Sequence, residues 1–287
     1  MTQNGAWRVL VTGGSTAGHV TSCIAVVDEL RKLAADTGVG EPELLYVGSH
    51  TRAEEPLVEA AGLSFRAVQT GKLRAYASIE NAIDLARLPI GIIQAARIIA
   101  AFRPQVVLST GGFAAVPPAI AAWLLRVPVV THDQTATIGL ANQIIARVAR
   151  RIALSDQRSI EHLSPRARQR AIVTGNPIRP GLLAGVPDRA AEQLDFDPND
   201  KLPVVYITGG SLGARSINRA VEDQLEAILE RWRVIHQTGS QLNDGISELD
   251  RLTARANALP RDLRARYRPV AFPEPDRLAD VYASCRL

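Results

Sequence analysis

The sequence predicts an α/β protein with two doubly wound parallel sheets, and three observations support this fold class. Short β-branched runs alternate with helical patterns from Trp7 onward, which is typical of right-handed βαβ units. A polar, proline-containing stretch at 175–203 interrupts the alternation, and the pattern restarts at Val204. The tetrapeptide Thr-Gly-Gly-Ser follows the first strand of each half, beginning at Thr12 and again at Thr208. We therefore expect a first domain at 1–178, a linker at 179–203 and a second domain at 204–287.

The first half is expected to contain six strands, with helices between them. Their aliphatic and β-branched runs lie near Trp7–Thr12, Leu44–Gly48, Phe65–Gln69, Val106–Ser109, Val127–His132 and Ile172–Thr174. In the second half the strands are expected at Val204–Thr208, Val234–Gln237 and Arg268–Phe272, followed by a helix at 276–284. Residues 285–287 resemble the opening of a further strand, so we expect the second domain to be incomplete.

Composition narrows the functional class. With 46% hydrophobic and 22% charged residues, the chain of 287 residues is typical of soluble globular proteins. A net charge of +4 with 5% aromatic residues disfavours a nucleic-acid binder and favours a phosphate-bearing ligand or an anionic membrane surface. The two cysteines, Cys23 and Cys285, lack metal-ligand spacing and are expected to be packing residues in a reducing cytosol. Neither a signal peptide nor a transmembrane run is recognised, so a cytosolic location is expected.

Three glycine-rich turns follow predicted strands. They are TGGSTAGH from Thr12, STGGFAAVPP from Ser109 and TGGSLGAR from Thr208. In open α/β sheets, such turns bring backbone N–H groups and helix N-termini to a phosphate. A tight turn that merely needs glycine explains any one copy equally well, but three copies favour anion binding. None matches the dinucleotide pattern or the P-loop, which disfavours nicotinamide cofactors and ATP hydrolysis.

Polar side chains near these turns are candidates for chemistry. His19 stands near the start of a predicted helix, where the helix dipole favours the neutral imidazole and suits a general base. A histidine that caps a turn or packs in the core is the alternative interpretation. Asp133 lies in VVTHDQT, with His132 and Gln134 beside it, and is either part of the same site or a helix N-cap. Arg179 in GNPIR is suited to hold a diphosphate or to bridge the two domains.

One segment has the pattern of a membrane-surface helix. Leu85–Pro104 is mostly apolar, with Arg87, Arg97 and Arg103 spaced through it. Trp123 is a candidate interfacial aromatic residue. Core packing explains both features equally well.

The ordered set of motifs resembles the MurG family of peptidoglycan N-acetylglucosaminyltransferases. These motifs are TGGSTAGHV, STGGF, THDQTATIGLANQ, TGNPIR, ITGGSLGARSIN and HQTG, and they cover nearly the whole chain. The resemblance implies a GT-B fold of two Rossmann-like domains, the second incomplete. It also implies an inverting hexosyltransferase that moves N-acetylglucosamine from UDP to a polyprenyl-diphosphate-linked muramyl acceptor, converting lipid I to lipid II. Such an enzyme acts without cofactor or metal at the cytoplasmic face of the membrane, in cell wall biogenesis, cell shape and cell division.

The resemblance also implies roles for individual residues. His19 or Asp133 would deprotonate the acceptor hydroxyl, and Arg179 would stabilise the departing UDP. The positions expected to contact the donor are Thr16, Ala17, Gly18, Thr135, Arg179 and Ser211. The positions expected to face the acceptor diphosphate are Gly13, Gly14, Gly111 and Gly112.

Departures from the family pattern leave two alternatives open. Phe113 replaces a tyrosine of the family and Thr135 replaces an asparagine, and further changes lie at Ala17, Ser22 and Pro273. They favour a transferase with a different acceptor. The family's ribose-binding glutamate would lie beyond Leu287, and its loss would weaken donor binding by roughly two to four orders of magnitude. The second alternative is therefore a catalytically impaired homologue that binds lipid diphosphate or an envelope partner.

Overall fold

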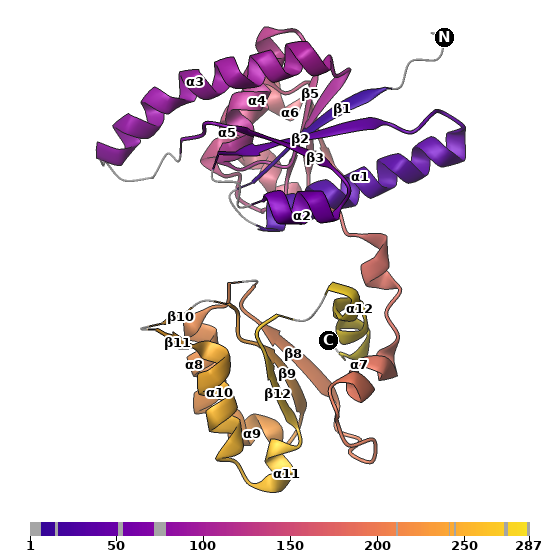
Figure 1. Cartoon of the computed structure of the whole chain (residues 1–287), viewed down its shortest axis with the longest axis vertical. Coiled ribbons are helices and arrows are strands. Elements are labelled where there is room, and N and C mark those ends of the chain that lie inside the picture. Colours follow the sequence, from indigo (N-terminus) through magenta and orange to yellow (C-terminus); the bar gives the residue numbers. More distant parts are fainter. Residues whose placement is uncertain are drawn as a thin grey trace. The chain divides into compact units, whose positions relative to one another are not determined.

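The computed structural model describes residues 7–14, 17–50, 54–71, 79–210, 212–240, 242–243, 245–272 and 275–285. The chain divides into two compact units, Met1–Arg179 and Pro180–Leu287 (Figure 1). Each unit is a parallel sheet with helices on both faces, so the predicted doubly wound α/β class is confirmed.

The first unit contains a parallel sheet of seven strands in the order β3-β2-β1-β4-β5-β6-β7. The strands are β1 (Arg8–Thr12), β2 (Glu43–Ser49), β3 (Ser64–Val68), β4 (Val106–Ser109), β5 (Val129–Asp133), β6 (Arg151–Leu154) and β7 (Ala171–Val173). The helices are α1 (Ala17–Thr37), α2 (Glu55–Ala60), α3 (Ile79–Phe102), α4 (Val116–Leu124), α5 (Leu140–Val148) and α6 (Pro165–Arg168), with 3-10 helices at Phe113–Ala115 and Gln157–His162.

Strand β1 shows why the sheet is covered on both faces. Its side chains alternate in direction, so Val9 and Val11 pack with α1 and α2, whereas Leu10 packs with the cluster that includes α3, α4 and α5. All three side chains are at most 1% exposed. A strand buried on both faces has a nearly continuous apolar sequence, as in "RVLVT".

Six of the seven strands match the sequence prediction, and β6 was not predicted. Its four residues begin with the exposed Arg151, and only Ile152 and Leu154 are buried. Two buried side chains are too few to establish a hydrophobic period between α5 and the following turn. The strand is held by parallel pairing to β5 and β7 instead.

The strand order reverses at β1, which pairs with β2 on one side and with β4 on the other. Parallel strands place their carboxyl ends at one edge, so the turns that follow β1 and β4 lie next to each other there. Such a switch point is the usual ligand site of an open α/β sheet.

The second unit contains a parallel sheet in the order β12-β9-β8. The strands are β8 (Val204–Thr208), β9 (Arg233–Gln237) and β12 (Tyr267–Val270), and a short antiparallel pair is formed by β10 (Leu242–Asn243) and β11 (Ile246–Ser247). The helices are α7 (Pro187–Gln193), α8 (Arg215–Asp223), α9 (Leu225–Leu229), α10 (Glu248–Asn257), α11 (Arg261–Arg264) and α12 (Pro275–Ser284), with a 3-10 helix at Pro180–Leu183.

The two faces of this second sheet have separate cores. Helices α8, α9 and α10 bury Val234 from one side, and α7 and α12 bury Ile235 from the other (Figure 1). Of the expected linker at 179–203, Arg179 ends the first unit and residues 180–203 lie within the second unit. Cys285 forms a parallel bridge with Val204 on β8, at the place where the sequence predicts the start of a further strand.

Candidate active site

His19 lies at the switch point of the first sheet, in the first turn of α1. Its Nδ1 is 2.7 Å from the carbonyl oxygen of Thr110, which follows β4. The hydroxyl of Thr110 donates in return to the backbone carbonyl of His19 at 2.8 Å. This pair of hydrogen bonds joins the β1–α1 turn to the β4–α4 turn, although the two residues are 91 positions apart.

The Thr110 contact fixes the tautomer of His19. A backbone carbonyl can only accept, so Nδ1 must carry the proton and donate. In the neutral ring Nε2 then holds an unshared electron pair. Nε2 has no hydrogen-bond partner among the described residues. A general base needs such an available nitrogen to accept the proton of a substrate hydroxyl.

Glycines allow the two turns to approach each other. Gly112 has φ +83°, and a Cβ added there would lie 2.0 Å from the carbonyl oxygen of Gly14 and 3.3 Å from the His19 ring. The amide of Gly14 donates to Gly111 O at 3.2 Å, and the amide of Gly111 donates to Ser109 Oγ at 3.1 Å. The amides of Gly14 and Gly111 therefore have acceptors within the protein and do not point at a ligand. Glycine is needed at Gly112 because a side chain would clash with the Gly14 carbonyl.

A buried carboxylate also lies beside Gly14. Glu54 is 3% exposed and accepts from Ser49 Oγ at 3.0 Å, and its Oε1 would be 2.3 Å from a Cβ on Gly14. A phosphate next to this group would meet like charge. The N–H groups of Phe113 and Ala114, which have no acceptor among the described residues, begin a helical segment and are better placed for an anion.

Asp133 ends β5 and is 2% exposed. Its Oδ1 accepts from the amide and the hydroxyl of Thr135, both at 2.8 Å, and its Oδ2 accepts from Asn142 Nδ2 at 2.5 Å. Both carboxylate oxygens are thus engaged by donors from the same unit. Such a carboxylate is suited to position neighbouring groups, whereas His19 offers the unoccupied nitrogen.

Asn142 was not singled out from the sequence, although it lies within the motif THDQTATIGLANQ. It sits on the buried face of α5 and is 7% exposed, and its Oδ1 is buried without a partner among the described residues. A Cβ on Gly111 would lie 2.3 Å from that oxygen. Asn142 therefore donates to Asp133 and packs closely against Gly111 in the glycine turn beside His19. The sequence signal that could have identified Asn142 is a polar side chain among the apolar residues of the buried face of α5.

The other predicted residues of the first unit are placed as follows. Gly18 lies in α1, and its carbonyl oxygen is 3.4 Å from Gln134 Nε2. His132 was expected at the same site as His19, but its Nε2 donates to the carbonyl oxygen of Gly175, which follows β7, at 3.0 Å. Arg179 is half-buried at the end of the unit and has no hydrogen bond or ion pair to any described residue. Thr16 and Ser211 lie outside the described residues, and of Ala17 only the backbone is described.

The second unit has its own paired turns, after β8 and β9. Gly213 has φ +84°, and a Cβ added there would lie 2.1 Å from the carbonyl oxygen of Thr238. Gln237 Nε2 donates to Gly210 O at 2.8 Å. The first backbone hydrogen bond of α8 runs from Asn218 N to Ala214 O. The preceding amides of that helix therefore point out of its N-terminus.

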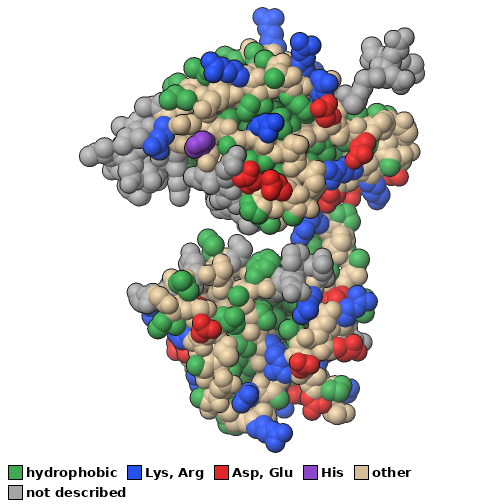
Figure 2. Space-filling model, in the orientation of Figure 1, with side chains coloured by type: hydrophobic (Ala, Val, Ile, Leu, Met, Phe, Trp, Pro, Cys, Tyr) green, Lys and Arg blue, Asp and Glu red, His purple; other side chains and the backbone are tan. Residues whose placement is uncertain are grey.

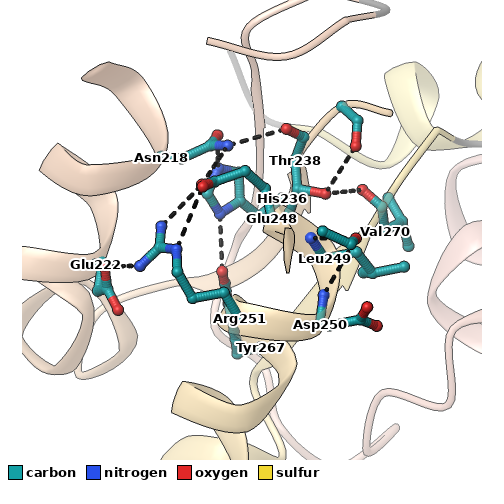
Figure 3. A network of polar contacts seen from close by, with 12 residues as sticks. Asn218, Glu222, His236, Thr238, Glu248, Leu249, Asp250, Arg251, Tyr267 and Val270 are labelled. Carbon is teal, nitrogen blue, oxygen red and sulfur yellow. Dashed lines mark hydrogen bonds and ion pairs between the residues drawn. The ribbon is translucent and has the colours of Figure 1, made fainter. Parts of the chain in front are cut away.

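Beneath these turns lies a buried polar network (Figure 3). His236 on β9 is 0% exposed, with Nδ1 2.8 Å from Tyr267 Oη and Nε2 3.2 Å from Asn218 Oδ1. Glu248 accepts from Asn218 Nδ2 at 3.1 Å and from Arg251 Nη2 at 2.8 Å. Burial, with a smaller contribution from the Arg251 charge, lowers the pKa of His236 to about 4.

This lowered pKa predicts a loss of stability in mild acid. The unfolded chain binds a proton at His236 near the ordinary value of 6.5, whereas the folded chain binds it only near about 4. Stability contributed by the neutral ring is thus complete above pH 6.5 and falls as the pH drops toward 4. The full effect is at most about 3 kcal/mol. Urea unfolding across this range should show the loss, and His236→Gln should reduce its slope; an unchanged slope would contradict the prediction.

The two parallel-sheet units, each with glycine turns at the carboxyl ends of its strands, define an α/β protein of the GT-B class. The solved structure of MurG from Acinetobacter baumannii has this fold, with a TM-score of 0.64 at 21% identity over 97% of this chain and 71% of that chain. UDP-GlcNAc 2-epimerase from Neisseria meningitidis, bound to UDP-GlcNAc, gives a TM-score of 0.62 at 14% identity over 96% and 74%.

Sequence comparison identifies the family. Residues 9–154 match the glycosyltransferase family 28 N-terminal domain, and residues 204–256 match its C-terminal domain. The chain belongs to glycosyltransferase family 28. A relative from Treponema pallidum, named UDP-N-acetylglucosamine–N-acetylmuramyl-(pentapeptide) pyrophosphoryl-undecaprenol N-acetylglucosamine transferase, is 37% identical over all of this chain and 71% of its own length. A relative of the same name from Clostridium botulinum is 36% identical over 83% of this chain and 64% of its own length.

Proposed function

We propose that this protein transfers N-acetylglucosamine from UDP to a muramyl sugar carried on polyprenyl diphosphate. The observation that carries the proposal is His19, whose Nδ1–H is held by Thr110 and whose Nε2 has no partner among the described residues. The names of the relatives at 36–37% identity support the same donor and acceptor.

In the proposed reaction, His19 Nε2 takes the proton of the acceptor hydroxyl. The hydroxyl oxygen then attacks the anomeric carbon, and the bond from that carbon to the UDP oxygen breaks with inversion of configuration. Asp133 and Asn142 hold the glycine turn beside His19 in place. The amides of Phe113 and Ala114 are suited to the acceptor diphosphate.

The donor is proposed to bind through the second unit and Arg179. Helix α8 begins at Arg215, directly after Gly213 and Ala214, and the partial positive charge of its N-terminus suits a nucleotide diphosphate. Ser211, the contact of that diphosphate predicted from the sequence, precedes this helix in the chain. Arg179 has no partner among the described residues and would neutralise charge on departing UDP.

The acceptor's lipid tail requires a membrane surface, and the first unit has a suitable one. Ile90 and Ile93 on α3 are 48% and 55% exposed, and Trp123 and Leu124 on the adjoining α4 are 53% and 58% exposed. In Figure 2, cationic and hydrophobic side chains intermingle over the part of the first unit where Figure 1 places α3. Among the described helices, none is long and apolar enough to cross a bilayer. We propose that this α3–α4 surface rests on the anionic cytoplasmic leaflet.

A substitution on the α3–α4 surface should weaken membrane binding. Ile93→Glu is expected to reduce partition onto vesicles containing anionic lipid about tenfold, because it removes one inserted aliphatic side chain and adds a negative charge. Leu33→Glu is the matched control, since Leu33 is 57% exposed but lies on α1, across the sheet. Vesicle cosedimentation measures both variants. Equal losses for the two, or none for Ile93→Glu, would contradict the proposed surface.

The proposed activity is tested by acceptor-dependent UDP release. The chain is incubated with UDP-N-acetylglucosamine, with and without a lipid-diphosphate muramyl acceptor, and free UDP is measured. We expect release only when the acceptor is present. UDP binding without release would favour the catalytically impaired alternative, and release with a non-muramyl glycolipid alone would favour the different-acceptor alternative.

A further inference from the structure

Asn218 occupies the centre of the network in the second unit (Figure 3). It lies on α8, is 1% exposed, and meets groups from β9 and α10. Its Nδ2 donates to the carbonyl oxygen of Thr238 at 2.9 Å and to Glu248 Oε2 at 3.1 Å, while its Oδ1 is 3.2 Å from His236 Nε2.

The orientation of this amide is fixed by its partners. Thr238 O and the Glu248 carboxylate can only accept, so both must face the NH₂ group of Asn218. Oδ1 is left to accept from His236, which must therefore carry its proton on Nε2. The hydroxyl of Tyr267 then donates to Nδ1 at 2.8 Å. Each side-chain N or O atom in this chain of contacts can therefore act only as a donor or only as an acceptor.

The Thr238 carbonyl held by Asn218 is also the group against which the glycine turn after β8 packs. A Cβ at Gly213 would be 2.1 Å from this oxygen, and a Cβ at Gly239 would be 2.2 Å from Leu212 O. The two turns therefore touch through backbone atoms, with no side chain between them to absorb a shift. A movement of the Thr238 carbonyl would move the turn at 212–214 and the start of α8 with it.

We infer that Asn218 is a positioning residue for the sugar-nucleotide diphosphate, acting through the Thr238 carbonyl on the turn at 212–214 that leads into α8. This inference rests on the proposed function, which places the diphosphate at that turn. His236 has a supporting part, because its Nε2–H prevents the Asn218 amide from flipping.

The test uses Asn218→Asp, which keeps the side-chain shape but removes both donors. At about pH 8 a carboxylate at this position would face the Thr238 carbonyl and the Glu248 carboxylate, and two like charges so close raise each other's pKa. The other titratable or charged groups around the site are His236 and Tyr267 from the sheet, Arg251 from α10 and Glu222 from α8. Protonation of the carboxylate pair at lower pH restores a donor.

UDP is the probe, and its affinity is measured by following loop amide signals during a titration. At about pH 8 the variant should bind UDP about tenfold more weakly than the unsubstituted chain, and at about pH 6 the difference should shrink to about threefold. At each pH the affinity of the variant is divided by that of the unsubstituted chain, so the effect of UDP protonation on binding cancels.

Two variants separate positioning from general destabilisation. His236→Gln keeps a donor toward Asn218 and should bind UDP within about threefold of the unsubstituted chain, whereas His236→Leu should lose about as much as Asn218→Asp. Asn257→Asp makes the same chemical change at an exposed site on α10 and should leave UDP affinity and its pH dependence unchanged.

The outcomes distinguish this inference from the proposed function. UDP binding by the unsubstituted chain, with the same affinity and pH profile in Asn218→Asp, would overturn the inference alone. Weaker binding that does not change with pH would also overturn it, because a purely structural defect has no reason to recover in acid. Absence of UDP binding by the unsubstituted chain would contradict the donor part of the proposed function and this inference together.

Discussion

Replacing His19 with asparagine should abolish sugar transfer while leaving the fold intact. The asparagine NH₂ group can still donate to the Thr110 carbonyl, as His19 Nδ1 does at 2.7 Å. It offers no basic nitrogen at the position of Nε2. Turnover should therefore fall by about 100- to 10,000-fold, the range that a positioned general base contributes. The rate of acceptor-dependent UDP release is the measurement.

His19→Ala is the companion variant, because it removes the Thr110 contact as well as the base. We expect both variants to be inactive, with a lower melting temperature for alanine than for asparagine. Retention of activity by His19→Asn would mean that the residue only ties two turns together. Asp133 would then become the candidate base, although its carboxylate oxygens already accept three hydrogen bonds.

The second large effect is expected from Gly112→Ala. Its φ of +83° is strained for any side chain, and the new Cβ would lie 2.0 Å from the Gly14 carbonyl. The β1–α1 and β4–α4 turns would have to separate, which also shifts His19. We expect a loss of about 3 kcal/mol or more in the free energy of unfolding and loss of activity. Chemical denaturation and the UDP-release assay measure the two quantities.

Gly40→Ala is the matched control for Gly112→Ala. Both lie in the first unit, but a Cβ at Gly40 meets nothing within 4 Å. The control should change the free energy of unfolding by less than about 0.5 kcal/mol. If both variants were equally stable and active, the tight packing of the two turns would not be a requirement of the site.

The fold was largely accessible from the sequence because its signals are local. Strand β1 is a buried aliphatic run and β8 is a partly buried one. Both are followed by glycine turns, and this local pattern is visible in the sequence without knowledge of the neighbouring strands. Strand β6 was not predicted from the sequence because only two of its residues, Ile152 and Leu154, are buried. Its existence depends on pairing with neighbours that are distant in the sequence.

The candidate site was only partly accessible, for a related reason. His19 was recognisable from its place after the first glycine turn, but the group that fixes its tautomer, Thr110, is 91 positions away. Asn142 joins Asp133 to Gly111 through contacts that appear only when α5 packs on the sheet. A sequence motif shows which polar residues are present and does not show which of their atoms are already occupied.

The repeated Thr-Gly-Gly-Ser also acquires a physical explanation. In each unit the turn after the first strand packs against the turn after a neighbouring strand through backbone atoms, Gly112 on Gly14 in one case and Gly213 on Thr238 in the other. Within the repeat itself, a Cβ on Gly14 would lie 2.3 Å from Glu54 Oε1 and a Cβ on Gly209 would lie 2.4 Å from Ala214 N, so these two glycines are required for packing. Gly210 has open space around it and is favoured by its φ of +84°. Only the first copy is followed by a histidine, His19, which is the residue proposed to take the acceptor proton.

The most direct test of the proposed function is the structure of the product. The chain is incubated with UDP-N-acetylglucosamine and a lipid-diphosphate muramyl acceptor, and the lipid fraction is analysed by mass spectrometry and NMR. We expect an acceptor enlarged by one N-acetylglucosamine residue in the β configuration, as inversion at the anomeric carbon requires. An acceptor of unchanged mass, or an α-linked product, would contradict the proposed function.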